Sequence, residues 1–161
     1  MKRIIVVTLL LAVSTILGRA QSSQDGKDSW IDLSTGLTWV TRDNGKDVSW
    51  KGAVKYCRTL RTGGYSDWRL ATLDELKGTY DKNSNSPGLD GRGASTWHVS
   101  GNLFLTGYQW SSEQRLDDRE RPSGYAWFFD FTDGRSSNQP SGNKDLSQNR
   151  LSKQAAFLRD Q

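Results

Sequence analysis

The sequence predicts an α+β domain that combines an antiparallel sheet with two short helices and long loops. Two helix patterns occupy 50–60 and 72–79, and short strand-like runs lie before and after them. Loops rich in glycine, asparagine and serine separate the later strands. Strands that are grouped apart from the helices, instead of alternating with them, favour an α+β layout over a parallel α/β fold.

The first twenty residues have the organisation of a secretory signal peptide. A basic pair, Lys2 and Arg3, precedes an apolar run over 4–17, and small residues follow it. The run is short for a membrane span. We expect cleavage before Gln21, export to the periplasm or the extracellular space, and no stable membrane insertion afterwards. An uncleaved anchor is the alternative, because Arg19 is unusual so close to a cleavage site.

The mature chain has almost no net charge. Three of the 22 lysines and arginines lie in the first twenty residues, which contain no acid, so 19 basic residues face 18 acidic ones. Net charge therefore gives no support to a nucleic-acid partner. The remaining chain of about 140 residues is long enough to bury one core. We divide it into a polar lead-in at 21–27 and a single domain at 28–161.

Aromatic residues supply most of the expected core. All seven tryptophans lie in the mature chain, where aliphatic residues are scarce. Each large aromatic side chain buries about 150–250 Å², so a few of them can replace many valines. We expect structural roles for Trp39, Trp50, Trp68, Trp110 and Trp127.

The first half of the domain predicts two strands and a helix. Strand-like runs at 29–33 and 37–40 flank a set of turn residues. Ser49 is a suitable N-cap for a helix that ends near Leu60. Spacings of three and four place one set of residues on a single apolar face of this helix: Trp50, Ala53, Val54, Cys57 and Leu60.

The stretch GYSDWRLATLDEL, residues 64–76, holds four charged side chains close together: Asp67, Arg69, Asp74 and Glu75. Thr72 and Glu75 match a capping box, in which each satisfies a backbone N–H at a helix start, and Asp74 suits the positive end of the helix dipole. We therefore expect a structural clip between a strand at 67–71 and the helix. A catalytic carboxylate pair is the alternative, although sequence spacing alone cannot set the separation that such a pair needs.

The second half predicts strands at 102–105, 108–112 and 125–131, a hairpin signal at 132–134 and a closing strand near 155–158. Three segments are expected to be loops: 81–96, 113–124 and 136–150. The loop at 113–124 is dense in charges of alternating sign, which is typical of a solvated surface.

Cys57 and His98 are the only cysteine and the only histidine. The chain therefore cannot form an internal disulfide or a metal cluster of cysteines and histidines. Cys57 falls on the apolar helix face, and we expect a buried structural thiol. A nucleophilic Cys57 with His98 as its base is the weaker alternative, since a nucleophile needs a partly exposed, electropositive setting.

No pattern in the sequence indicates a cofactor, a metal or an enzyme. The common nucleotide-binding, hydrolase and metalloprotease motifs are absent. Residues 81–86 start like an EF-hand loop, but position six is Ser86 and position twelve is Arg92. One looser alternative remains, a calcium site formed by Asp81, Asn83, Asn85 and Asp90.

Six motifs, taken in order, resemble one known family. They are TGLTW (35–39), SWKGAVKYCRTL (49–60), GGYSDWRLATLDELKGTYD (63–81), NLFLTGYQWSSEQ (102–114), GYAWFFDFTDGR (124–135) and AAFLRD (155–160). These motifs are similar to the Legionella collagen-like protein C-terminal domain family, a large set of exported bacterial modules of largely unknown function. The resemblance implies a C-type-lectin-like fold, distantly similar to the formylglycine-generating enzyme domain, in which the DWRL segment is scaffold.

The chain departs from the family pattern at two positions. The usual proline after WRL is Ala71 here, which removes one turn constraint. Relatives often carry a cysteine near the C-terminus, which the resemblance implies would bridge to Cys57, and this chain has Phe157 instead. The resemblance therefore implies that the bridge is absent and that Phe157 packs against the Cys57 helix.

The resemblance implies binding more than catalysis, because the best-studied relatives are adhesin ends that engage acidic polysaccharides. We expect an exported, non-catalytic recognition module that binds a glycan. The expected contacts lie at 81–98 and 113–121, since recognition concentrates in long loops on a rigid scaffold. Arginines there can grip carboxylate or sulfate groups, and an indole can stack on a sugar face. The candidate residues are Arg92, Trp97, His98, Arg115, Arg119 and Arg121.

Two other functions stay open. An envelope structural or assembly protein would use its loops to contact another protein. An enzyme of the formylglycine-generating type would need a pair of cysteines to hold copper, and one cysteine cannot supply it. The sequence also lacks the Glu-Pro-Asn and Trp-Asn-Asp motifs of lectin calcium sites.

Overall fold

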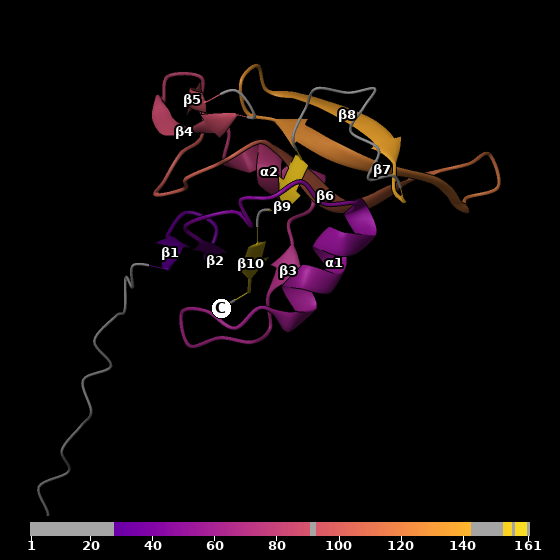
Figure 1. The fold of residues 1–161 in the computed structure, drawn as a ribbon, viewed down its shortest axis with the longest axis horizontal. Coiled ribbons are helices and arrows are strands. Elements are labelled where there is room, and N and C mark those ends of the chain that lie inside the picture. Colours follow the sequence, from indigo (N-terminus) through magenta and orange to yellow (C-terminus); the bar gives the residue numbers. More distant parts are fainter. Residues whose placement is uncertain (1–27, 91–92, 143–152, 156, 161) are drawn as a thin grey trace, which may run out of the picture.

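The computed structural model describes residues 28–90, 93–142, 153–155 and 157–160. Within them the fold consists of mostly antiparallel sheets and two short helices, which confirms the α+β prediction (Figure 1). The expected signal peptide and the lead-in at 21–27 lie outside the described residues. No helix in the described part of the chain is both long and apolar enough to cross a membrane.

The first sheet brings together strands from the two ends of the domain. Its order is β1 (Ser29–Asp32), β2 (Leu37–Val40), β10 (Phe157–Arg159) and β3 (Arg69–Leu70), and each neighbouring pair is antiparallel. β1 and β2 form the predicted hairpin, and Gly36 in its turn has a φ of 74°. Leu158 lies opposite Trp39, so β10 occupies the interior of the sheet (Figure 1).

The second sheet has the order β8 (Arg135–Pro140), β7 (Pro122–Asp130), β6 (Tyr108–Leu116) and β9 (Lys153–Ala155). β6, β7 and β8 are antiparallel neighbours, whereas β9 runs parallel to β6. The closing strand expected near 155–158 is therefore two strands, β9 and β10, which belong to different sheets.

Two segments that were predicted to be loops form strands of this sheet instead. The segment at 113–124 is the end of β6, a tight turn and the start of β7, and the loop expected from 136 begins instead with most of β8. β6 is buried only near its start, at 109–111, and most of its later residues are exposed. Because most side chains in the outer part of this hairpin are exposed, no apolar alternation marks its strands in the sequence.

A separate hairpin, β4 (Ser86–Asp90) and β5 (Gly93–Trp97), replaces most of the loop expected over 81–96. It is rich in glycine and serine, and Trp97 is its one large buried side chain among the described residues. Gly88 is required there, because a Cβ at this position would collide with the Trp97 ring and the Leu105 carbonyl. The strand expected at 102–105 is an irregular segment with one bridge, from Phe104 to Arg42.

Both helices begin at the caps that the sequence predicts. α1 (Trp50–Thr59) begins after Ser49, whose hydroxyl accepts from the Gly52 N–H at 3.2 Å. α2 (Leu73–Gly78) begins after Thr72, and Thr72 and Glu75 form the predicted capping box. α1 lies against β3 and buries Cys57 on that side (Figure 1).

The core divides into two clusters, and each contains at least three large aromatic side chains. The first contains Trp39, Ala71, Leu73, Leu76, Trp97, Val99, Leu103, Leu105, Phe129, Phe131 and Leu158. The second lies under α1 and contains Ala53, Cys57, Trp68, Leu70, Trp110, Ala126 and Phe128. Trp127 is half-buried against the first cluster, and Trp50 is half-buried against the second. The predicted aromatic core is therefore confirmed.

Phe157 is placed only by its backbone, because its side chain lies outside the described part of the chain. Its antiparallel partner in β3 is Leu70, and Leu70 shares the second cluster with Cys57. The thiol of Cys57 is buried and free. The packing of Phe157 against the Cys57 helix stays a prediction.

Candidate binding site

The Arg69 guanidinium holds β3 against α2. Its Nη1 and Nη2 donate to Oε2 and Oε1 of Glu75, both at 2.8 Å, and Nη2 also donates to Oδ1 of Asp160 at 2.9 Å. Oε2 of Glu75 accepts from the Thr72 N–H as well, at 2.7 Å. One carboxylate therefore completes the helix cap and the contact between strand and helix.

The other charged residues of the DWRL segment are also paired within the fold. Asp67 accepts a hydrogen bond from Nε of Arg159 in β10 at 2.9 Å. Asp74 pairs with Lys77 across one turn of α2 at 3.0 Å. The predicted structural clip is confirmed, and this geometry gives no support to a catalytic carboxylate pair.

Asp43 is a half-buried acid that sequence patterns do not single out. Burial raises the pKa of this carboxyl, even though it accepts hydrogen bonds from Thr106 N and Oγ1, Gln109 Nε2 and the Gly45 N–H. The four distances lie between 2.6 and 3.0 Å. These bonds join the loop after β2 to the start of β6, so Asp43 is a structural clasp between two segments.

Trp97 cannot stack on a sugar face as expected, because only 1% of it is exposed. Its ring packs edge-on against Tyr108, and its Nε1 donates to the Leu89 carbonyl at 3.1 Å. The expectation was wrong because it treated 81–96 as an open loop. The β4–β5 hairpin instead folds over the indole and makes it a core residue.

The described contacts of His98 do not form a binding site at 81–98, and Arg92 adds no evidence for one. His98 is half-buried, its Nδ1 lies 2.6 Å from the Ser84 carbonyl oxygen, and its ring meets the edge of Tyr80. Arg92 lies outside the described residues. Asp81 uses Oδ1 to accept from the Asn83 N–H within a turn. The described residues contain no group of three acidic, cysteine or histidine side chains that could hold a metal ion.

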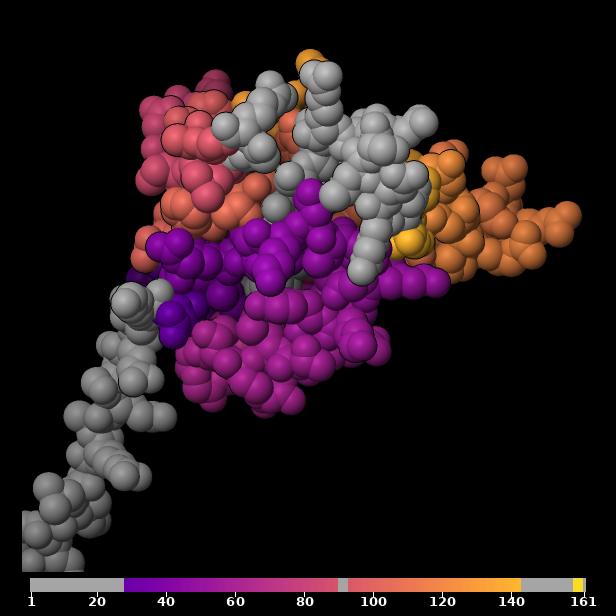
Figure 2. All heavy atoms as spheres, in the orientation of Figure 1, coloured from indigo at the N-terminus to yellow at the C-terminus, as the bar shows by residue number. Residues whose placement is uncertain are grey.

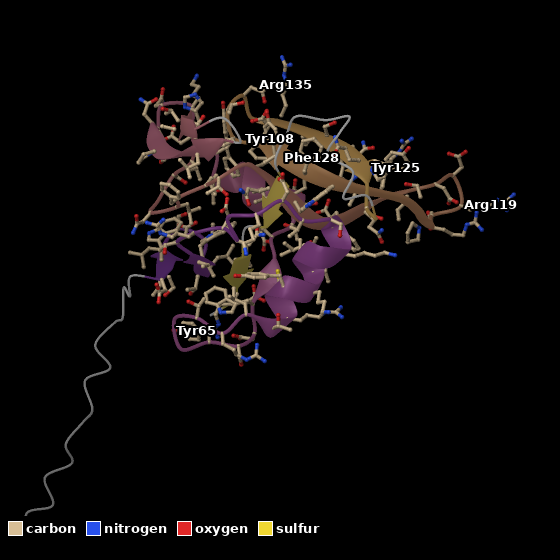
Figure 3. All side chains as sticks on the ribbon, in the orientation of Figure 1. Tyr65, Tyr108, Arg119, Tyr125, Phe128 and Arg135 are labelled. Atoms are coloured by element: carbon tan, nitrogen blue, oxygen red, sulfur yellow. The ribbon has the colours of Figure 1, made fainter. Side chains whose placement is uncertain are left out.

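Arg115, Arg119 and Arg121 lie together at the far end of the β6–β7 hairpin. Asp117 accepts from Nε and Nη2 of Arg121, at 3.1 and 2.8 Å, and its other oxygen accepts the Arg119 and Arg121 N–H groups. This hairpin projects from the body at the end opposite to β4 and β5 (Figures 1 and 2), with Arg119 at its tip (Figure 3). The two expected halves of the site are therefore far apart.

A groove of about 480 Å³ runs beside α1, and Arg69 and Thr72 of the clip are among its lining residues. We call it the α1 groove. Its lining residues are Trp50, Val54, Cys57, Arg58, Trp68, Arg69, Leu70, Thr72 and Ser112. α1 supplies one wall and the β3 segment the other, with Ser112 from β6 between them. Several of these residues have the pattern of core residues in the sequence, which carries no signal for an opening above them.

Most polar groups of the α1 groove already have partners. Trp50 Nε1 donates to the Ser111 carbonyl at 2.8 Å, and Trp68 Nε1 donates to the Thr62 carbonyl at 3.3 Å. The guanidinium of Arg69 is occupied by the clip. What remains toward the groove is an apolar surface made mainly of indole and aliphatic carbon, with the Arg58 side chain at its edge.

The solvent side of α1 is basic. Lys51, Lys55 and Arg58 are exposed, and their spacings of four and three place them on one side of the helix. They extend for about 10 Å along the helix axis. None of the three has an ion pair within the described part of the chain, and the first turn of α1 contains no acid. We call this surface the basic face of α1.

The sequence carries the signal for the basic face of α1, which the expected binding residues at 81–98 and 113–121 did not include. Once the apolar residues define the buried side of the helix, the same period of 3.6 residues assigns the lysines and Arg58 to solvent. Together with the segment that follows it, α1 forms the lower part of the molecule in Figure 2.

The model of the Lcl C-terminal domain family matches residues 29–149 of this chain. The chain belongs to the Lcl C-terminal domain family. This confirms the resemblance to the Legionella collagen-like protein C-terminal domain, and the match includes both helices and the DWRL clip. Among proteins with curated functions, none matches the chain.

Proposed function

We propose that this Lcl C-terminal domain is an exported, non-catalytic recognition module that binds an acidic polysaccharide on the basic face of α1. The observation that carries the proposal is the alignment of Lys51, Lys55 and Arg58 on an exposed helix side without ion pairs among the described residues. The C-type-lectin-like fold is part of the same proposal. It is supported by the family membership and by the mostly antiparallel sheets with two short helices.

A local row of cations suits a repeating anion better than a single one. With the net charge of the mature chain near zero, attraction to an acidic polymer must come from such a local cluster. Arg58 can bind a carboxylate or sulfate through two parallel hydrogen bonds, and the lysines act as point charges. Attraction between exposed charges weakens over a Debye length of about 10 Å at 0.1 M salt, so binding should fall as salt rises.

The pKa shifts of Glu75 and Cys57 support a non-catalytic module, because they are opposite to those that catalysis needs. Hydrogen bonds from Arg69 lower the pKa of Glu75, whereas a general acid needs a raised pKa near the working pH. Burial raises the pKa of the Cys57 thiol to about 12, and a nucleophilic cysteine needs a lowered one.

The proposal is tested by removing the three charges and measuring polysaccharide binding. The triple variant Lys51→Gln, Lys55→Gln, Arg58→Gln removes the charges and keeps polar, unbranched side chains of similar helix propensity. It should bind dextran sulfate at least tenfold more weakly than the unmodified mature domain in low salt, and uncharged dextran should bind neither protein. The matched control replaces Arg115, Arg119 and Arg121 with glutamine. Binding lost only in that control would move the site to the β6–β7 hairpin.

A protein partner is the second candidate, and one observation favours it. Leu116 and Tyr125 are 53% and 41% exposed on the projecting β6–β7 hairpin. Exposed apolar side chains on an arm suit a protein contact. If no polysaccharide binds, the double variant Leu116→Ser, Tyr125→Ser tests for a protein partner. This variant should no longer bind an envelope protein that the unmodified domain binds. The α1 triple variant should still bind that protein.

A further inference from the structure

We propose that the α1 groove binds the apolar chain of an anionic amphiphile, with the anionic head group at Arg58. The ligand class is a single acyl or alkyl chain that ends in a carboxylate, phosphate or sulfate. This site is distinct from the basic face of α1, with which it shares only Arg58, and it does not depend on polysaccharide binding.

The base of the α1 groove consists of core residues that show one edge to the opening. Trp68 and Cys57 are 3% exposed and Leu70 is 4% exposed, and all three belong to the second core cluster. Trp50 and Val54 of α1 are half-buried and line the same space. A groove of about 480 Å³ is within the usual range of small-molecule sites, roughly 300–1,000 Å³.

The hydrogen bonds around the α1 groove argue against a sugar ring inside it. A sugar ring carries several hydroxyl groups, and burying each one without a partner is unfavourable. The indole N–H groups of Trp50 and Trp68 are taken by backbone carbonyls, and Oγ1 of Thr72 accepts from the Glu75 N–H. A chain of methylene groups needs no such partners, so it fits this surface better.

The charge at the rim determines the head group. Two arginines line the α1 groove, and Arg69 already donates to Glu75 and Asp160. Arg58 is exposed and has no ion pair within the described residues. A single uncompensated guanidinium at the mouth of an apolar groove is complementary to one anionic group at the end of an apolar chain.

The test titrates the mature domain with hexanoate, octanoate and decanoate, below the concentrations at which they form micelles. Calorimetry gives the dissociation constant, and the fluorescence of the groove indoles reports the site. Burying one methylene changes binding by about fourfold, so the constant should fall by about that factor per added carbon until the groove is full. Decanol has the same chain without the charge and should bind more weakly than decanoate, and propionate should not bind.

Two kinds of variant locate the site. Val54→Phe fills the groove and should weaken decanoate binding at least tenfold, whereas Thr59→Phe adds the same ring outside the groove and should not. Ser112→Trp narrows the groove from the β6 side and decides the matter if Val54→Phe fails to fold. Arg58→Gln should weaken decanoate but not decanol. Lys51→Gln with Lys55→Gln should leave decanoate binding unchanged.

The proposal is overturned if affinity does not depend on chain length, or if Val54→Phe and Ser112→Trp bind decanoate as tightly as the unmodified domain. If the unmodified domain binds dextran sulfate but not decanoate, only the groove proposal is wrong. If it binds decanoate but not dextran sulfate, only the polysaccharide proposal is wrong.

Discussion

The two terminal nitrogens of the Arg69 guanidinium each donate to one oxygen of the Glu75 carboxylate, both at 2.8 Å. The same carboxylate caps α2 through the Thr72 N–H. Two local features of the sequence, a strand that ends in WRL and a helix that begins with a capping box, are therefore joined by a single acid. This gives a structural reason why four charged residues stand so close together in this stretch.

Replacing Glu75 with glutamine should destabilise the domain by about 1–2 kcal/mol. Hydrogen bonds between charged groups contribute about 1.5–3 kcal/mol, and partial exposure of the pair reduces that figure. Chemical denaturation of both proteins measures the difference. Asp74→Asn is the matched control, because Asp74 lies on the surface of the same turn and pairs only with Lys77. Equal stability of both variants would contradict the clip.

The effect of Glu75 should also depend on pH. Its pKa in the folded protein is below the ordinary value of 4.5, so its ionised form is favoured by folding. The stabilisation is therefore fully present above pH 4.5 and is lost as the pH falls through the folded value. The difference in unfolding free energy between the unmodified domain and Glu75→Gln should shrink below pH 4.5. A constant difference down to pH 2 would show that the charge of Glu75 is not what stabilises the fold.

Trp68→Ala should lower the free energy of unfolding by about 3–5 kcal/mol, the usual loss for a buried large aromatic side chain. Only 3% of Trp68 is exposed. Tyr125→Ala is the control for losing an aromatic ring, since Tyr125 is 41% exposed, and it should change stability by less than about 1 kcal/mol. Similar effects of the two substitutions would mean that Trp68 does not hold the second cluster together.

Cys57 should react very slowly with a thiol reagent in the folded protein. At pH 8 a thiol with a pKa of about 12 is ionised in roughly one molecule in ten thousand. Unfolding the domain in denaturant should restore ordinary labelling. Ser112→Cys in a Cys57→Ala background places a thiol at an exposed lining position of the α1 groove and should label quickly without denaturant. Fast labelling of Cys57 itself would show that its thiol is accessible.

Local chemistry made part of the fold predictable from the sequence. Ser49 and Thr72 cap helices because their side chains satisfy N–H groups a few residues away, and such contacts need no knowledge of the tertiary structure. The apolar face of α1 follows from the helical period in the same way. These features depend on neighbours within one or two turns, so the sequence contains all the information that they require.

The remainder depended on contacts that sequence spacing does not encode. The β4–β5 hairpin is mostly polar, and Trp97 is its one large buried side chain among the described residues, so it has no apolar alternation and was expected to be a loop. As a result, Trp97, a core residue, was expected to stack on a sugar. The α1 groove was not predictable for a related reason, since it exists only where α1 and β3 leave space between them.

Nuclear magnetic resonance can show whether acidic polysaccharide binds the basic face of α1. A ¹⁵N-labelled mature domain is titrated with short oligomers of dextran sulfate, and amide shifts are followed residue by residue. We expect the largest shifts in α1 between Lys51 and Thr59, and we expect them to decrease as salt is added. Large shifts confined to 113–121, with α1 unchanged, would contradict this expectation.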